Sequence, residues 1–131
     1  MQYTKSYVGN VPKEKLVFEW NDDDPSNYHY SESDLTVDSN WHELDISSKV
    51  PSDAKAVMLA VIVRDNAAAS HFRIRATTQS EQVQVAQIRT QVANVNFDGI
   101  LIVELDANGK FDYNCHSSMD ICKITILGWF R

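Results

Sequence analysis

The chain of 131 residues is acidic, with 18 Asp and Glu against 12 Lys and Arg and a formal net charge of −6. A chain of this length is most simply one domain, residues 1–131, and it can bury roughly 68–70% of its unfolded surface without help from a metal ion or a disulfide. The charge balance excludes nucleic acid and anionic membranes as main partners, because both bind clustered Lys and Arg.

The N-terminal third is mostly polar. We expect an extended N-terminal arm over residues 1–14, and this segment lacks the apolar core of a signal peptide, so the localisation stays open, with a virion as one option. Leu16–Trp20 predicts a short strand, and the acidic run Asn21–Pro25 predicts a loop. Beyond the loop, only Tyr28–Tyr30 and Leu35–Val37 resemble strands.

The strongest pattern lies in the middle of the chain. Leu44 and Ile46 alternate with acidic residues, as in a half-buried strand, and Val50–Asp53 predicts a proline turn. The apolar run Ala56–Val63 is rich in β-branched residues and far shorter than the roughly 20 residues of a membrane-spanning helix. We interpret the run as a strand. A buried helix is the competing interpretation, although no helix cap precedes the run.

Alternation divides this run into two faces, and both are apolar. The face predicted to fill the core consists of Val57, Leu59, Val61 and Val63, and the opposite face of Ala56, Met58, Ala60 and Ile62. Ile100–Leu105 is two-sided in the same way. Because a strand of an antiparallel sandwich normally has one polar face, something other than water should cover the second face. We predict a homo-oligomer, and the alternative is that the N-terminal arm folds back through Tyr3, Tyr7 or Val8.

The remaining elements are short and separated by turn residues. We expect strands at His71–Thr77, Ile100–Leu105, Lys110–Cys115 and Ile121–Phe130, two strands with a bend within Gln82–Phe97, and turns at Asp98–Gly99 and Asp106–Gly109. About eight or nine strands at this spacing predict an all-β fold, an antiparallel β-sandwich or barrel.

Part of the chain resembles a known group of domains. The matching pieces are Trp41, Leu44–Ser48, Val50–Pro51, Ala54–Val57, Ile88–Val95, Asp98–Gly99, Val103–Asp106 and Ile126–Trp129. They resemble small jelly-roll-like β-domains of phage and environmental proteins, which often lie near the C-termini of tail-fibre-like proteins. The resemblance covers residues 41–131, and Pro51–Ala54 replaces the usual glycine-containing turn. It implies a jelly-roll-like sandwich in a viral or phage-like particle, with a trimer favoured because fibre-tip domains are commonly trimeric.

No catalytic pattern is present. The sequence contains no G-x-S-x-G, no H-E-x-x-H and no glycine-rich phosphate loop, so we predict no catalytic residue, no cofactor and no enzymatic activity. A small hydrolase is kept only as a hypothesis for comparison. Cys115, His116 and Cys122 supply three irregularly spaced ligands where structural zinc takes four, so no metal site is predicted. The sequence leaves open whether the two cysteines are free thiols or form a disulfide across a hairpin. Calcium at the Asp22–Asp24 loop is also left open, because the loop lacks the glycine and distal glutamate of an EF-hand.

Aromatic residues give the clearest functional hint. Trp20, Tyr28, Tyr30 and Trp41 cluster in the polar part of the sequence, where their rings could stack on a cell-surface glycan, and they are the candidate ligand-binding residues. The alternative is that the rings pack at the sandwich edge. The first functional hypothesis is a non-enzymatic structural or receptor-binding domain of a viral or phage-like particle, and the alternative is a stand-alone carbohydrate-binding module or lectin.

Overall fold

The computed structural model describes residues 7–8, 11–12 and 15–131. Over these residues it contains ten strands and no helix. The strands are β1 (Tyr7–Val8), β2 (Val11–Pro12), β3 (Phe18–Trp20), β4 (Trp41–Asp45), β5 (Ala56–Arg64), β6 (His71–Arg75), β7 (Ala86–Arg89), β8 (Phe97–Glu104), β9 (Lys110–Cys115) and β10 (Ile121–Phe130). In this part of the chain, no helix is long and apolar enough to cross a membrane.

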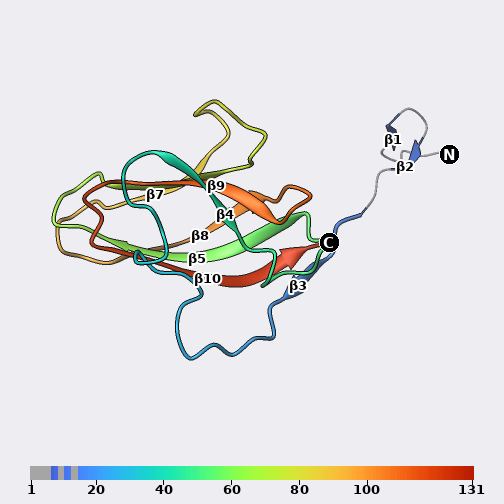
Figure 1. Cartoon of the computed structure of the whole chain (residues 1–131), viewed down its shortest axis with the longest axis horizontal. Coiled ribbons are helices and arrows are strands. Elements are labelled where there is room, and N and C mark those ends of the chain that lie inside the picture. The colour runs from blue at the N-terminus through green and yellow to red at the C-terminus, as the bar shows by residue number, and fades with distance from the viewer. Residues whose placement is uncertain (1–6, 9–10, 13–14) are drawn as a thin grey trace.

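The strands β3 to β10 form two four-stranded antiparallel sheets that pack face to face (Figure 1). The β5 sheet has the order β3-β10-β5-β8, and the β9 sheet has the order β4-β9-β6-β7. Apart from the step from β6 to β7, each strand is followed in the chain by a strand of the other sheet. This is the strand order of an eight-stranded jelly roll. The predicted fold class, an antiparallel sandwich of jelly-roll type, is confirmed.

Strand β5 forms the centre of the core. Val57, Leu59, Val61 and Val63 are at most 1% exposed, so the predicted core face is confirmed. Leu59 lies between Leu101 of β8 and Ile126 of β10 within its own sheet. From the β9 sheet, fully buried Phe72 and Phe111 complete the core. Burial of each such side chain contributes roughly 1.5–3 kcal/mol to the stability of the fold. The run forms a strand, so the competing helix interpretation is wrong.

The predicted turn at Asp98–Gly99 is wrong, because both residues lie inside β8. Asp98 pairs with Ile62 and Gly99 with Val61 in the β5–β8 ladder. A Cβ atom on Gly99 would lie 3.1 Å from Cδ1 of Ile88, on β7 of the opposite sheet. The glycine therefore permits close packing between the sheets, which produces the same sequence signal as a hairpin turn.

The prediction of two strands within Gln82–Phe97 is also wrong. The segment contributes only β7 and the first residue of β8. Val83 is 85% exposed and Val92 is 55% exposed, so neither has a core face. Asn94 has a φ of 62° and donates its backbone N–H to the carbonyl of Asp65 at 2.7 Å, which turns the chain into β8.

The other two predicted turns form, the proline turn one residue later than predicted, at residues 51–54. The backbone N–H of Ala54 donates to the carbonyl of Pro51 at 3.0 Å, and that of Gly109 donates to the carbonyl of Asp106 at 3.1 Å. Gly109 has a φ of 73°, a conformation that favours glycine. Of the N-terminal arm, Tyr3 lies outside the described residues, and only the backbone of Tyr7 and Val8 is described.

Candidate functional site

The outer face of the β5 sheet is apolar and accessible. On β5 its residues Ala56, Met58, Ala60 and Ile62 are partly exposed. On the neighbouring strand, Ile100 is 62% exposed and Ile102 is 49% exposed. The register places Ile102 beside Met58 and Ile100 beside Ala60, so the apolar side chains form one continuous stripe, which we call the outer stripe.

Two of the four predicted ligand-binding aromatics are held by the protein itself. The guanidinium carbon of Arg75 lies 3.9 Å from the centre of the Trp41 ring, and Arg75 also pairs with Asp112 at 3.5 Å. Tyr30 packs against the core, and burial, followed by the charges of Asp45 and Asp34, raises its pKa to about 12. Both rings therefore contribute contacts within the sandwich.

The other two aromatics are accessible but border different depressions. Trp20 is 66% exposed and meets Phe18 edge to face, with ring centres 4.8 Å apart. Tyr28 is 45% exposed, and the Lys123 ammonium group lies 6.0 Å from its ring centre. The depression at Tyr28 is shared with Thr125 and does not include Trp20. The predicted residues are thus not gathered into one site.

A bulge in β10 turns a different tryptophan toward the core side of the sheet, where it stays partly exposed. Ile126 pairs with Leu59, but Gly128 pairs with the next residue, Met58, so Leu127 is an extra residue in the ladder. After this shift Trp129 lies opposite the buried Val57 and packs on the core while remaining partly exposed. A bulge of this kind re-aims the side chains that follow it.

Hydrogen bonds fix the orientation of the Trp129 ring. Its indole Nε1–H donates to Oε1 of Glu19 on β3 at 3.0 Å. Arg131 donates to the same oxygen at 3.1 Å and to Asp53 at 2.9 Å. The bonds from Trp129 and Arg131 lower the pKa of Glu19, which therefore stays a carboxylate acceptor.

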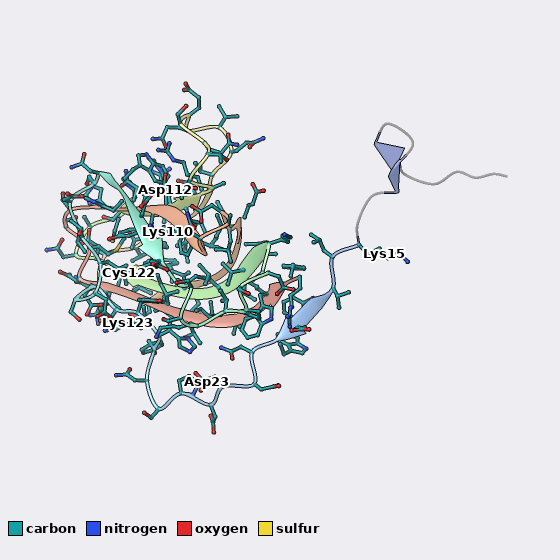
Figure 2. All side chains as sticks on the ribbon, turned by 45° about the vertical axis from the view of Figure 1, so that its right-hand side comes forward. Lys15, Asp23, Lys110, Asp112, Cys122 and Lys123 are labelled. Atoms are coloured by element: carbon teal, nitrogen blue, oxygen red, sulfur yellow. The ribbon has the colours of Figure 1, made fainter. Side chains whose placement is uncertain are left out.

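The loop between β3 and Tyr30 is fastened to the same part of β10. Asn21 donates its side-chain amide to the carbonyl of Ile126 at 3.1 Å, and His29 accepts the backbone N–H of Ile126 on Nδ1 at 2.9 Å. Because Nδ1 is an acceptor, Nε2 carries the hydrogen, and it lies 3.1 Å from Oδ2 of Asp23. Asp23 is thereby oriented while its carboxylate remains accessible, on a loop that projects from the sandwich on the side away from Asp112 (Figure 2).

These residues border a groove, which we call the Trp129 groove. It consists of two depressions of about 540 and 640 Å³ that share Asn21, Asp23 and Trp129. The first is completed by His29, Ser48, Lys49, Val50 and Pro51, and the second by Glu19, Trp20 and Asp22. The groove combines aromatic surface with carboxylate acceptors and amide and ammonium donors, which is the chemistry that binds a polar ligand with an apolar face.

Sequence reasoning found Trp20 in this groove and missed Trp129, Asp23 and His29 as binding candidates. One signal for the position of Trp129 was present in the sequence. Apolar residues at even positions alternate with polar ones from Cys122 to Ile126, whereas the apolar residues Leu127 and Trp129, on either side of a glycine, are at odd positions. Such a change of parity marks a bulge.

Reactive residues form no second site in the part of the chain that the structure describes. There, no group of three or more His, Cys, Asp or Glu side chains is placed to hold a metal ion. Cys115 and Cys122 are free thiols buried in the core. Their pairing as a disulfide is not seen.

Comparisons with known proteins give likenesses to solved structures but none to a protein family. No protein-family model matches the chain, and no curated protein matches it. A solved structure of the Tobacco streak virus coat protein matches with 9% sequence identity, a TM-score of 0.37, and coverage of 88% of this chain and 83% of that chain. At this identity and TM-score, no conclusion about this chain rests on the likeness.

Proposed function

We propose that this protein is a non-enzymatic structural domain that assembles with a second copy of itself through the outer stripe, as part of a viral or phage-like particle. The observation that carries the proposal is the continuous apolar surface from Met58 and Ala60 to Ile100 and Ile102. Contiguous apolar patches are uncommon on soluble monomers and mark interfaces. The small side chain of Ala60 lets a partner surface approach closely.

The charges beside the stripe favour a second copy as the occupant. Asp98 on β8 and Lys123 on β10 both pair with Ile62 of β5, so they flank the stripe in the same row. A two-fold axis parallel to β5 would place β8 of one copy over β10 of the other. Asp98 would then face the partner copy's lysine of the same row, which also pairs with Glu32 at 2.9 Å within its own copy, and the contact would occur twice.

Light scattering on the purified protein tests this arrangement. We expect a species of twice the monomer mass at tens of micromolar, and a folded monomer for Met58→Asp. Val83→Asp, on a loop residue that is 85% exposed, is the matched control and should leave the dimer intact. A wild-type protein that is monomeric at this concentration would overturn the proposal.

Charge reversal tests the register of the pairing. Asp98→Lys and Lys123→Asp should each weaken the dimer, and the double variant should restore part of the affinity, because the two charges would again be opposite in sign.

Deletion of residues 1–12 distinguishes the dimer from the rival explanation, in which the N-terminal arm covers the outer stripe. If the N-terminal arm covers the stripe, the wild type should be a monomer and the deletion should cause association.

The particle context is supported by two features. The jelly-roll strand order is shared by viral capsid and lectin domains, and residues 41–131 resemble domains of tail-fibre-like proteins. A trimer, favoured by that resemblance, remains a prediction, and the mass from light scattering distinguishes it from the two-fold pair.

A second candidate function is recognition of a glycan, as in a receptor-binding domain or a lectin. It is favoured by the Trp129 groove, where Trp129 and Trp20 lie beside Asp23 and Asn21. A glycan array with the purified protein tests this candidate directly. The groove and the outer stripe use different residues, although Gly128 pairs with both Trp20 of the groove and Met58 of the stripe.

A further inference from the structure

The Trp129 groove has the composition of a site for one class of sugar. We infer that it binds an uncharged hexopyranose, which stacks its apolar C–H face on the Trp129 ring while Asp23 accepts hydrogen bonds from its hydroxyl groups. The inference rests on the second candidate function, recognition of a glycan, and adds the ligand class and the residues that select it.

The aromatic platform is already in its final orientation. Trp129 lies opposite Val57 and packs against the core, and the hydrogen bond from its Nε1–H to Glu19 fixes one edge of the ring. A ring that is fixed before binding loses little conformational freedom when a ligand arrives. Pro51 and Val50 border the groove and extend its apolar surface.

The acceptor is oriented as well. His29 is only 8% exposed and contacts Oδ2 of Asp23, whereas Asp23 itself is 56% exposed. The imidazole is fixed in turn by its bond to the backbone of Ile126. One carboxylate oxygen is therefore positioned, and the other remains available for neighbouring hydroxyl groups, each of which is a donor to an ionised carboxylate. Lys49 borders the same depression and adds an ammonium donor.

The charge of the groove selects against anionic ligands. Glu19, Asp22 and Asp23 all border the depression at Trp20, and the whole chain carries a formal charge of −6. Arg131 pairs with Glu19 and also with Asp53. Lys49 alone does not balance Asp22 and Asp23, so a carboxylated or sulfated sugar would be repelled. An uncharged sugar meets no such penalty, because its hydroxyl groups donate to the carboxylates.

The test is a titration of the full chain with five sugars, in which binding is measured by tryptophan fluorescence and by calorimetry. The sugars are the methyl glycosides of glucose, mannose and galactose, together with lactose and 3′-sialyllactose. We expect at least one uncharged sugar to bind and sialyllactose to bind more weakly than lactose. Asp23→Asn should weaken binding about tenfold or more, as expected for loss of a hydrogen bond to a charged group. Asp24→Asn is the matched control: Asp24 is an exposed neighbour outside the groove lining, and its replacement should leave the affinity unchanged.

A second variant reports on the platform without removing the ring. Trp129→Phe keeps an aromatic face and should retain weakened binding while reducing the sugar-dependent fluorescence change to the part that comes from Trp20. Thermal melting checks that both variants are folded. Binding of sialyllactose in preference to lactose, or equal affinities for Asp23→Asn and Asp24→Asn, would overturn the inference and leave glycan recognition standing. Absence of binding to every sugar, here and on the array, would overturn both.

Discussion

The aromatic ring of Phe18 on β3 lies directly over Gly128 on β10. A Cβ atom at position 128 would come within 2.5 Å of Cζ of Phe18 and would also collide with the backbone carbonyl of Glu19. The glycine is thus the position at which the short edge strand β3 fits closely against β10. Phe18 also contacts Phe130, with ring centres 5.0 Å apart, so the same packing fastens the end of the chain.

Gly128→Ala should therefore destabilise the protein. The expected loss is about 1–3 kcal/mol, the usual result of adding a methyl group to a tightly packed site, because one of the clashing atoms is backbone and cannot rotate away. Urea unfolding measures the loss. In a Phe18→Ala background, Gly128→Ala should cause a smaller further loss but not zero, because the carbonyl of Glu19 still collides. No further loss in that background would mean that the ring alone causes the clash.

Leu59→Ala should destabilise by about 2–5 kcal/mol, the usual result of leaving a cavity in a packed core. Leu59 is 0% exposed at the centre of β5, between Leu101 and Ile126. Val83→Ala, at a position that is 85% exposed, is the control and should change stability by less than about 0.5 kcal/mol. A loss for Leu59→Ala as small as that of the control would contradict the core assignment.

Asp65 should make stability depend on acid pH. Burial alone would raise its pKa, but hydrogen bonds from the hydroxyl groups of Ser118 and Ser70 and the N–H of Asn66 hold the pKa below the ordinary value. A depressed folded-state pKa adds stability above the unfolded-state value of about 3.9, and this stability is lost as the pH falls through the folded-state pKa. The difference in unfolding free energy between wild type and Asp65→Asn should therefore be constant near neutral pH and shrink below about pH 4.

A second variant checks the cause of this dependence. Ser118→Ala removes one of the two hydroxyl donors and should reduce the acid-sensitive stability in the same pH range, by less than Asp65→Asn. A pH profile of Ser118→Ala that coincides with the wild type would show that the hydroxyl group does not hold the carboxylate.

The two cysteines should react with alkylating reagents only when the protein unfolds. Cys115 and Cys122 are both 0% exposed, and the contact with Cys115, together with burial, raises the pKa of Cys122 well above its ordinary value. Since the thiolate is the reactive form, iodoacetamide should label neither residue in the native protein and both in urea. Mass spectrometry counts the added groups. Rapid native labelling would contradict the buried position of these thiols.

The sequence by itself determined the features that depend on neighbouring residues. The alternation of Ala56–Arg64 was sufficient to predict which side chains of β5 are buried, because successive residues of a strand point to opposite faces. The turn at Asp106–Gly109 was equally local, since the side chain of Asp106 accepts the backbone N–H groups of Asn108 and Lys110 at 2.9 and 3.0 Å. The apolar outer stripe followed from the same alternation in β5 and β8.

Only the tertiary structure decided the features that join distant residues. The sequence around Gly99 indicates a turn, because it does not show that Ile88 of the other sheet lies against this glycine. The Trp129 groove depends on the bulge at Leu127 and on the hydrogen bond from Trp129 to Glu19. Trp129 and Glu19 are 110 positions apart in the sequence. Hydrophobic periodicity reports which face of a strand is buried, but it does not report which strands are paired. In a jelly roll, where most consecutive strands lie in different sheets, the composition of a surface site is set by that pairing.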